Sequence, residues 1–300
     1  MSASGKAHRG TLFVEDAIVL EVQDWPDDQY VVRLLAPKTA AAAEPGSFVH
    51  LQCDESIPMR RPLSIMRAHA GDGWIEVLFK IVGDGLRALA SRKKGDAVSS
   101  LGPIGQGFKP HAERPRTVLV GGGVGIPPMV FLAEHLMQGP AKWHPVVFMG
   151  SEIPFPMETM RSALPVAGID ADVDSAMSLL ESWSVPSRLA SLSGYGGCFD
   201  GYVTALADQH LSELAPDDLA EVEVFACGPT PMLAAVAKVA QRHAVPCQVS
   251  LEEYMACAVG GCAGCTVEVR TSEGPAMRRV CVDGPVFDAD AVFPADAASA

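Results

Sequence analysis

Four of the eight cysteines lie close together near the C-terminus, and their spacing constrains the fold more than any other feature. They are Cys257, Cys262, Cys265 and Cys281, in the pattern C-x4-C-x2-C-x15-C. A [2Fe–2S] cluster needs four converging thiolates, and three from a tight loop with a fourth from further along is a spacing that such clusters use. Small residues between the cysteines let the backbone curl and direct N–H groups at sulfur. Structural zinc and a disulfide pair remain alternatives, although zinc sites usually show C-x2-C twice and only one such pair is present.

The composition is that of a folded, acidic chain. Its 300 residues suffice for two or three domains, and 48% hydrophobic with 20% charged residues excludes a disordered protein. A net charge of −13 argues against nucleic acid as the main partner. No apolar run reaches the length of about 18 residues that a membrane span needs, and the first ten residues lack the apolar centre of a secretory signal. We therefore expect a cytoplasmic protein with reduced thiols.

The first third of the chain, residues 11–108, has the pattern of short strands separated by Gly and Pro turns. The strand-like segments are TLFVEDAIVLEV, YVVRLLAP, SFVHLQC, WIEVLFKIV and DAVSSLGPIG. Several short strands of this kind favour an antiparallel β-barrel or sandwich. One short helix is expected at residues 85–95, with Gly95 as its C-terminal stop.

Two motifs in this region suggest a flavin. The segment RRPLSI, residues 60–65, could place a cation and a hydroxyl on the same side of a strand end, as a flavin diphosphate and ring require. A surface basic pair beside a core strand is the alternative. The segment VGDGL, residues 82–86, opens the expected helix, whose first N–H groups favour phosphate. An ordinary glycine turn explains this second motif equally well.

The middle third predicts a nucleotide-binding layer. The apolar run TVLV at residues 117–120 is typical of a buried parallel strand, and GGGVG followed by IPPMVFLAEHLM indicates a glycine loop and a helix. Such a loop lets a pyrophosphate approach the backbone, although the strict G-x-G-x-x-G fingerprint is absent. Further strands are expected at residues 144–151 and 221–227, and a weaker one at 168–174, while residues 175–200 receive no assignment.

Repeated strand–helix units favour a doubly wound α/β domain with its ligand at the carboxyl ends of the strands. The segment ACGPTPML falls at such an end, so Cys227 is a candidate contact for a nicotinamide ring. A small buried residue at a strand end is an equally good interpretation of this cysteine. After it, TVEVR and RRVCVDGPVF complete a small terminal module whose core is expected to be largely the cluster itself, so that the metal holds it folded.

At this point the chain resembles a known family. SLEEYMACAVGGCAGCTVEV followed by RRVCVDGPVF is similar to the electron transfer subunit of the NAD-linked, class 1B dihydroorotate dehydrogenases, within the ferredoxin–NADP reductase superfamily. The resemblance covers roughly residues 10–290 in order, through RRPLSI, VGDGL, GPIGQGF, GGGVGIPPM, ACGPTPML and the four cysteines. It implies a β-barrel FAD domain at residues 10–112, a doubly wound α/β NAD-binding domain at 113–245, a small C-terminal [2Fe–2S] module at 246–290 and a tail at 291–300.

The resemblance also implies individual contacts. For FAD these are Arg61, Pro62, Leu63, Ser64, Leu78, Phe79, Lys80, Gly85 and Leu86. For NAD they are Gly121, Gly122, Gly123, Gly125, Cys227, Gly228 and Pro229, and for iron they are Cys257, Cys262, Cys265 and Cys281. No acid–base catalytic residue is expected. The chain departs from the family at Leu86, which offers no hydroxyl to a phosphate, and around residues 172–200, where a longer segment leaves the choice between NADH and NADPH open.

The resemblance implies an electron transfer function in pyrimidine biosynthesis. Dihydroorotate would be oxidised on a separate FMN-containing catalytic subunit, in a heterotetramer, and electrons would reach NAD+ through the [2Fe–2S] cluster and FAD. One alternative keeps the cofactors but serves another complex, such as a hydrogenase, a sulfite reductase or a glutamate synthase-like enzyme. A second alternative is a non-catalytic, nucleotide-sensing protein with structural zinc at the four cysteines.

Overall fold

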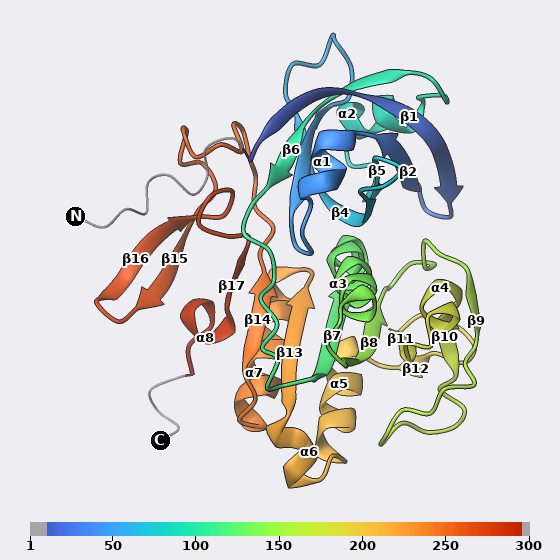
Figure 1. Cartoon of the computed structure of the whole chain (residues 1–300). Coiled ribbons are helices and arrows are strands. Elements are labelled where there is room, and N and C mark those ends of the chain that lie inside the picture. The colour runs from blue at the N-terminus through green and yellow to red at the C-terminus, as the bar shows by residue number, and fades with distance from the viewer. Residues whose placement is uncertain (1–10, 296–300) are drawn as a thin grey trace.

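Three parts of the chain pack together in the computed structural model, which describes residues 11–295. A β-barrel lies above a helix-covered sheet, and a C-terminal module lies at their side (Figure 1). The expectation that the first ten residues are not a secretory signal concerns residues outside the described range. Residues 296–300 of the expected tail also lie outside it. None of the helices among residues 11–295 has the length and apolarity needed to cross a bilayer.

The first part is a closed six-stranded antiparallel barrel in the order β1-β2-β5-β4-β3-β6, which confirms the barrel prediction. In β6 every second side chain is buried, as period-2 strands facing a core require. Helix α2 ends earlier than expected, because the Asp96 carboxylate accepts the Lys93 N–H at 2.8 Å and fixes a turn into β6. The elements are β1 (Phe13–Trp25), β2 (Gln29–Leu35), α1 (Pro37–Ala42), β3 (Phe48–Gln52), β4 (Arg61–His69), β5 (Trp74–Lys80), α2 (Asp84–Ala90) and β6 (Ala97–Ile104).

The second part is a seven-stranded sheet in the order β12-β11-β8-β7-β13-β14-β17. All neighbouring pairs are parallel except β14 with β17, and the chain order reverses between β7 and β13, so this is the predicted doubly wound α/β domain. Its strands are β7 (Arg116–Gly122), β8 (His144–Gly150), β11 (Ser187–Ser191), β12 (Phe199–Asp200), β13 (Val222–Cys227), β14 (Cys247–Ser250) and β17 (Val286–Asp288).

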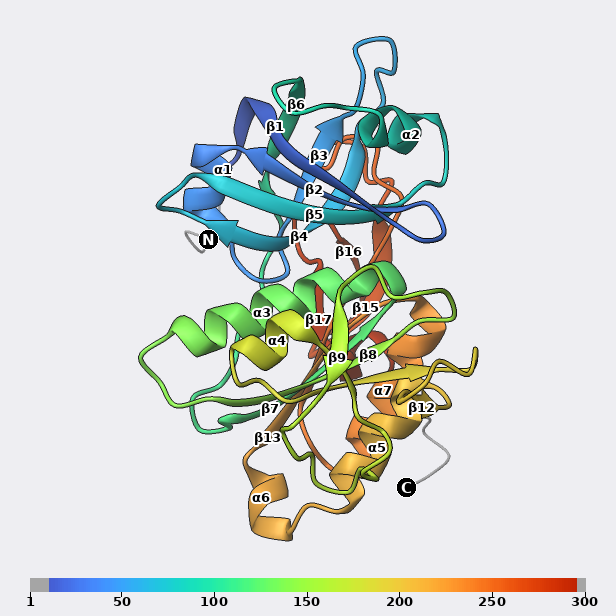
Figure 2. The same ribbon diagram turned by 90° about the vertical axis from the view of Figure 1, so that its right-hand side faces the viewer.

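Helices cover both faces of this sheet (Figures 1 and 2). Leu119 packs with α3 (Ile126–Gln138) on the side of the barrel, whereas Val118 and Val120 pack with α5 (Val203–Ser212) and α7 (Thr230–Arg242) on the opposite side. Burial on both faces explains the uninterrupted apolar run at residues 117–120. The remaining short elements are η2 (Gly123–Gly125), α4 (Ser178–Ser182) and α6 (Pro216–Ala220).

The strand expected at residues 168–174 is wrong. This segment forms turns, and the third parallel strand is β11, inside the segment that received no assignment. The polar residues of SRLAS hid the strand: the Ser187 hydroxyl accepts the Met177 N–H at 3.2 Å, and the Arg188 guanidinium donates to the Leu164 carbonyl at 2.7 Å, so both can be buried. Nearby, β9 (Thr159–Arg161) and β10 (Ser175–Met177) form a separate two-stranded sheet.

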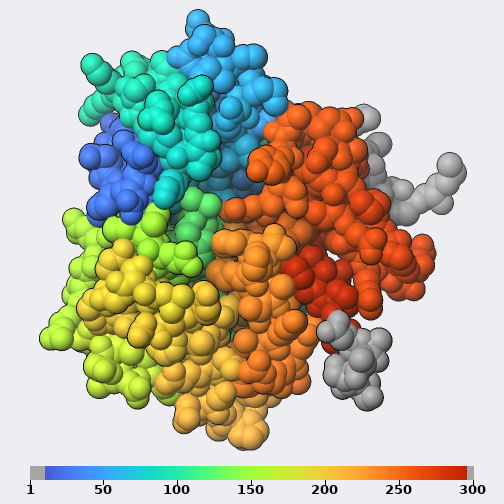
Figure 3. All heavy atoms as spheres, turned by 180° about the vertical axis from the view of Figure 1, so that it is seen from behind, coloured from blue at the N-terminus to red at the C-terminus, as the bar shows by residue number. Residues whose placement is uncertain are grey.

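The C-terminal module is continuous with the rest of the molecule. It contains the hairpin of β15 (Thr266–Thr271) and β16 (Gly274–Arg279), followed by β17 in the large sheet and α8 (Ala289–Val292). Seen from behind, it lies along one flank of both larger parts (Figure 3). Cys265 and Cys281 belong to the same hydrophobic core as Phe48 and Ile104 of the barrel, so protein packing holds the module in addition to any metal. The domain bounds given from the sequence stay predictions.

Candidate redox site

The four spaced cysteines lie on segments that follow β14 and β16. Cys262 is exposed and Cys257 half-buried, whereas Cys265 and Cys281 are each 3% exposed. All eight cysteines of the chain are free of disulfides, so the disulfide interpretation finds no support here. The loop curls tightly, with positive φ at Ala258 (55°) and Gly260 (78°). Such turns direct backbone N–H groups inward: the Cys262 N–H donates to the Cys257 sulfur at 3.4 Å.

The four thiols form two pairs. Burial opposes ionisation of Cys257, but hydrogen bonds from Val259 and Cys262 more than offset it and lower its pKa to about 7. Burial and then the neighbouring Cys265 thiol raise the pKa of Cys281 to about 12, while the backbone N–H of Gly260 donates toward its sulfur and acts in the opposite direction. Cys257 therefore lies beside Cys262 and Cys281 beside Cys265, and Cys257 is also close enough to Cys281 to raise its pKa.

This pairing fits two metal ions better than one. A tetrahedral zinc site needs four donors around one point, whereas each iron of a [2Fe–2S] cluster takes two thiolates. Two thiol pairs with N–H groups directed at their sulfurs are the donor set of a binuclear cluster, and metal binding would hold the thiols deprotonated.

Backbone contacts fix the segment that follows Cys281 against the barrel. The Gln106 N–H, just after β6, donates to the Gly284 carbonyl at 2.6 Å. A side chain at Gly105 would place its Cβ 2.4 Å from Pro285, so only glycine permits this approach. On the other side, the Leu251 N–H donates to the Pro285 carbonyl at 2.9 Å. The segment that follows Cys281 is thus held between the barrel and the large sheet.

The residues predicted to hold FAD lie where two barrel strands part. Strand β4 pairs with β5 only from Ile65 onward, opposite Val77. The earlier residues Arg61–Ser64 pair with β3, and the later residues Leu78–Lys80 pair with β2. The facing edges of these two segments therefore carry backbone groups without a partner strand. Such groups need other hydrogen-bonding partners, and the polar edge of a flavin ring can provide them.

A place for the flavin diphosphate adjoins this opening. A Cβ on Gly85, at the start of α2, would lie 3.0 Å from Nε of Arg61, so the absence of a side chain is what lets the guanidinium lie over the helix start. The Arg61 guanidinium and the N–H groups at the start of α2 together suit a phosphate group. Leu86 is 6% exposed and packs in the barrel core, as does Phe79 at 1%, so both could meet a cofactor only through backbone groups. This explains how the chain tolerates a leucine at position 86.

The predicted nicotinamide residues form two loops in direct contact. A Cβ on Gly125 would lie 2.3 Å from the Cys227 carbonyl oxygen, and a Cβ on Gly122 would lie 2.4 Å from the Met232 sulfur. The glycine loop after β7 therefore packs onto the loop after β13, at the switch point of the sheet. Cys227 itself is 0% exposed, and burial, followed by the nearby Glu252 charge, raises the pKa of its thiol well above the usual range.

Three residues near these sites were missed from the sequence. Glu252 follows β14 and its side chain is exposed at the surface, yet the protein atoms packed around its carboxyl raise its pKa, and its charge acts on Cys227. His50 lies fully buried on β3, opposite Pro62 of the predicted flavin segment. The Arg279 guanidinium donates to the carbonyl of Gly260, in the loop between Cys257 and Cys262 (the cluster loop). Glu252 belongs to the segment SLEEYMAC. No local pattern distinguishes it, because the residue on which it acts, Cys227, is distant in the sequence.

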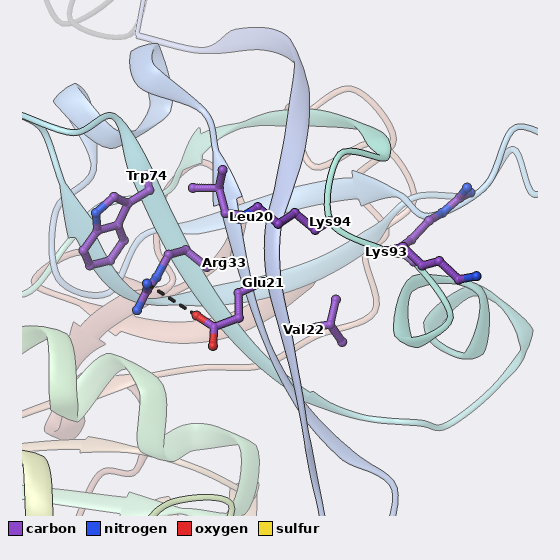
Figure 4. Close-up of a pocket in the computed structure, with 8 residues that line it drawn as sticks. Leu20, Glu21, Val22, Arg33, Trp74, Lys93 and Lys94 are labelled. Carbon is purple, nitrogen blue, oxygen red and sulfur yellow. Dashed lines mark ion pairs between the residues drawn. The ribbon is translucent and has the colours of Figure 1, made fainter.

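One hollow on the surface lies away from all of these residues. An open depression of about 790 Å³ lies on the outside of the barrel, lined by residues that include Glu21, Arg33 and Trp74 (Figure 4). Arg33 and Glu21 form an ion pair there at 3.4 Å. None of the residues predicted to bind a cofactor or metal lines this depression.

Comparisons with known proteins bear on the whole chain. A family model described as the iron–sulfur cluster binding domain of dihydroorotate dehydrogenase B matches residues 252–293. The dihydroorotate dehydrogenase B (NAD(+)) electron transfer subunit of Desulforamulus reducens is 32% identical over 276 residues, which cover 91% of this chain and 96% of that relative. The same subunit from Shouchella clausii is 32% identical over 266 residues, covering 87% and 90%. The chain belongs to this family of electron transfer subunits.

Solved structures agree with this family's expected fold. The structure of an NADH-dependent reduced ferredoxin–NADP oxidoreductase has a TM-score of 0.73 at 24% identity, covering 93% of this chain and 90% of that one. A ferredoxin–NADP+ reductase from Neisseria gonorrhoeae has a TM-score of 0.54 at 15% identity, covering 78% and 92%. At these identities the likeness shows the fold alone. As an electron transfer subunit, the chain has its cluster-binding segment where the four cysteines were singled out, whereas the individual contact residues stay predictions.

Proposed function

We propose that this subunit carries electrons from the FMN of a dihydroorotate-oxidising partner to NAD+, while holding a [2Fe–2S] cluster and FAD. The observation that carries the proposal is the packing of the cluster segment on the barrel: Cys265 and Cys281 share one core with Phe48 of β3. Phe48 is paired with Ser64 in the predicted flavin segment. The predicted metal site therefore shares a core with β3, and β3 is the strand paired with the predicted flavin segment of β4. This proximity suits electron transfer between the two sites.

The protein's part in this function is binding and positioning. Arg61 would neutralise the diphosphate, and the parted edges of β4 and β5 would hold the ring. The glycine loop at Gly122 and Gly125 would bring the nicotinamide nucleotide to the carboxyl ends of the strands. When bound, FAD supplies the conversion between one-electron and two-electron transfer.

The proposal includes a partner and a location. The relatives are electron transfer subunits, so we propose an FMN-containing dihydroorotate dehydrogenase catalytic subunit as partner, in a heterotetramer. Cys262 is the exposed ligand and marks the side of the cluster where that partner's flavin would approach. We place the complex in the cytoplasm, where a chain with eight free thiols keeps them reduced.

Anaerobic co-expression with the candidate FMN subunit tests this function. We expect co-purification, iron and sulfide at two each per chain as a [2Fe–2S] cluster requires, bound FAD, and dihydroorotate-dependent reduction of NAD+. The chain by itself should reduce artificial acceptors with NADH but should not oxidise dihydroorotate. A complex that forms instead with a hydrogenase, sulfite reductase or glutamate synthase-like subunit would keep the cofactors and change the partner. Protein that is colourless above 400 nm and holds zinc without iron would refute the redox function altogether.

A further inference from the structure

Arg279 joins the two segments that carry the cysteine pairs. It ends β16, two residues before Cys281, and its backbone pairs with Thr266, the residue after Cys265. Its side chain extends the other way, where Nη1 donates to the Gly260 carbonyl at 3.0 Å. Gly260 lies in the loop between Cys257 and Cys262. One side chain therefore contacts both halves of the ligand set.

The contact acts on a residue that is itself directed at sulfur. Gly260 has φ of 78°, a left-handed conformation that favours glycine, and its N–H faces the Cys281 sulfur. A Cβ on Gly260 would lie 3.2 Å from Nη1 of Arg279 and 2.6 Å from Val282. The carbonyl of Gly260 is thus held by Arg279 while its N–H is aimed at a ligand. Releasing the carbonyl would let the loop turn and would weaken the N–H···S contact.

The guanidinium is itself held in place. The Asp283 carboxylate accepts the backbone N–H of Arg279 at 2.8 Å and lies 3.5 Å from its Nε. The Asp283 N–H in turn donates to the Arg279 carbonyl at 2.8 Å. With 41% of its side chain exposed, Arg279 is not inserted into the core to fill volume. Its polar contacts are with Asp283, in the turn that carries Cys281, and with the Gly260 carbonyl in the other loop.

We propose that Arg279 is a positioning residue that sets the reduction potential of the cluster, by fixing the Gly260 N–H on the Cys281 sulfur and by placing a cation beside the ligand set. This inference rests on the proposed [2Fe–2S] site. Reduction adds one negative charge to the cluster, so a hydrogen bond to sulfur and a nearby cation stabilise the reduced form more than the oxidised form. Both effects raise the potential, and both depend on the same side chain.

Three variants separate these effects in the full chain loaded with its cofactors. Arg279→Gln removes the charge and the planar guanidinium with its several N–H donors. Arg279→Lys keeps the charge but replaces the guanidinium with a compact ammonium group. Arg278→Gln is the matched control, since it removes the same charge from the adjacent exposed position of the same strand. The measurements are iron and sulfide content, the electron paramagnetic resonance signal of the reduced cluster, and a mediated redox titration of that signal.

We expect Arg279→Gln to keep its cluster but to have an oxidised-to-reduced ratio about tenfold higher at fixed potential, a shift of about 59 mV to lower potential for one electron. Arg279→Lys should shift in the same direction by about threefold, roughly 30 mV, and Arg278→Gln should match the wild type. Iron-loaded Arg279→Gln and Arg279→Lys with wild-type potentials would overturn this inference alone. Wild-type chain without iron would instead overturn the proposed function.

Discussion

The stability of the barrel should depend on pH through one buried histidine. Val49 and Leu51 point into the barrel, so His50 between them points outward, toward the cluster loop that covers it. Burial, followed by the charge of Arg60, lowers its pKa from 6.5 to about 4, although backbone groups of Met255 and Arg60 act the other way. The contacts of the ring nitrogens with these backbone groups fall short of hydrogen-bond geometry, so neither nitrogen is satisfied within the described residues. The folded chain therefore keeps this ring neutral.

The sign and size of the effect follow from these values. Because the folded-state pKa is the lower one, the unfolded chain binds more protons between pH 6.5 and 4, so stability is present above this window and is lost as the pH falls through it. A shift from 6.5 to about 4 makes the loss between pH 7 and pH 5 about 2 kcal/mol from this ring alone. Staying at pH 5 or above limits the contribution of carboxylates.

Urea unfolding of wild type and His50→Leu, followed by tryptophan fluorescence at pH 7 and pH 5, measures this term. The variant should lose about 2 kcal/mol less than the wild type over this range. At pH 7 its stability should be close to that of the wild type, since it removes two unpartnered nitrogens without leaving a partner behind. His144→Gln, at an exposed position, is the control and should keep the wild-type difference. Equal losses in wild type and His50→Leu would refute the reasoning.

Three further predictions concern the cofactor sites. Gly125→Ala should abolish NADH-dependent reduction of ferricyanide, because its Cβ would meet the Cys227 carbonyl at 2.3 Å, whereas Gly139→Ala, whose Cβ would lie an ordinary 3.6 Å from the nearest atoms at the end of α3, should retain activity. Leu86→Thr should lower stability by about 1–3 kcal/mol in thermal unfolding without tightening FAD binding, since the side chain at this position faces the barrel core. Tighter FAD binding measured by fluorescence would contradict this placement. Cys262→Ser should lose transfer to the partner while keeping NADH-to-FAD transfer, and equal loss of both in a folded variant would count against the cluster as the link to the partner.

Much of the fold could be predicted because its signals are local. Period-2 strands indicated the barrel, and an apolar run followed by a glycine loop and a helix indicated β7 and α3. The cysteine spacing indicated the cluster for the same reason, since three of the ligands lie within nine residues of sequence. Strand β11 was missed because Ser187 and Arg188 are buried through hydrogen bonds to segments that the sequence does not place.

The cluster module shows where local signals end. The sequence suggested a module held mainly by its metal, but the predicted ligands Cys265 and Cys281 are buried in one core with Phe48 and Ile104 of the barrel. That contact joins the two ends of the chain, and no periodicity or spacing reports it. The same contact buries His50 beside Met255, so the histidine's lowered pKa is a consequence of the module's position. The part of the pH dependence that His50→Leu removes would therefore report the docking of the cluster segment on the predicted flavin barrel, an arrangement that suits electron transfer between them.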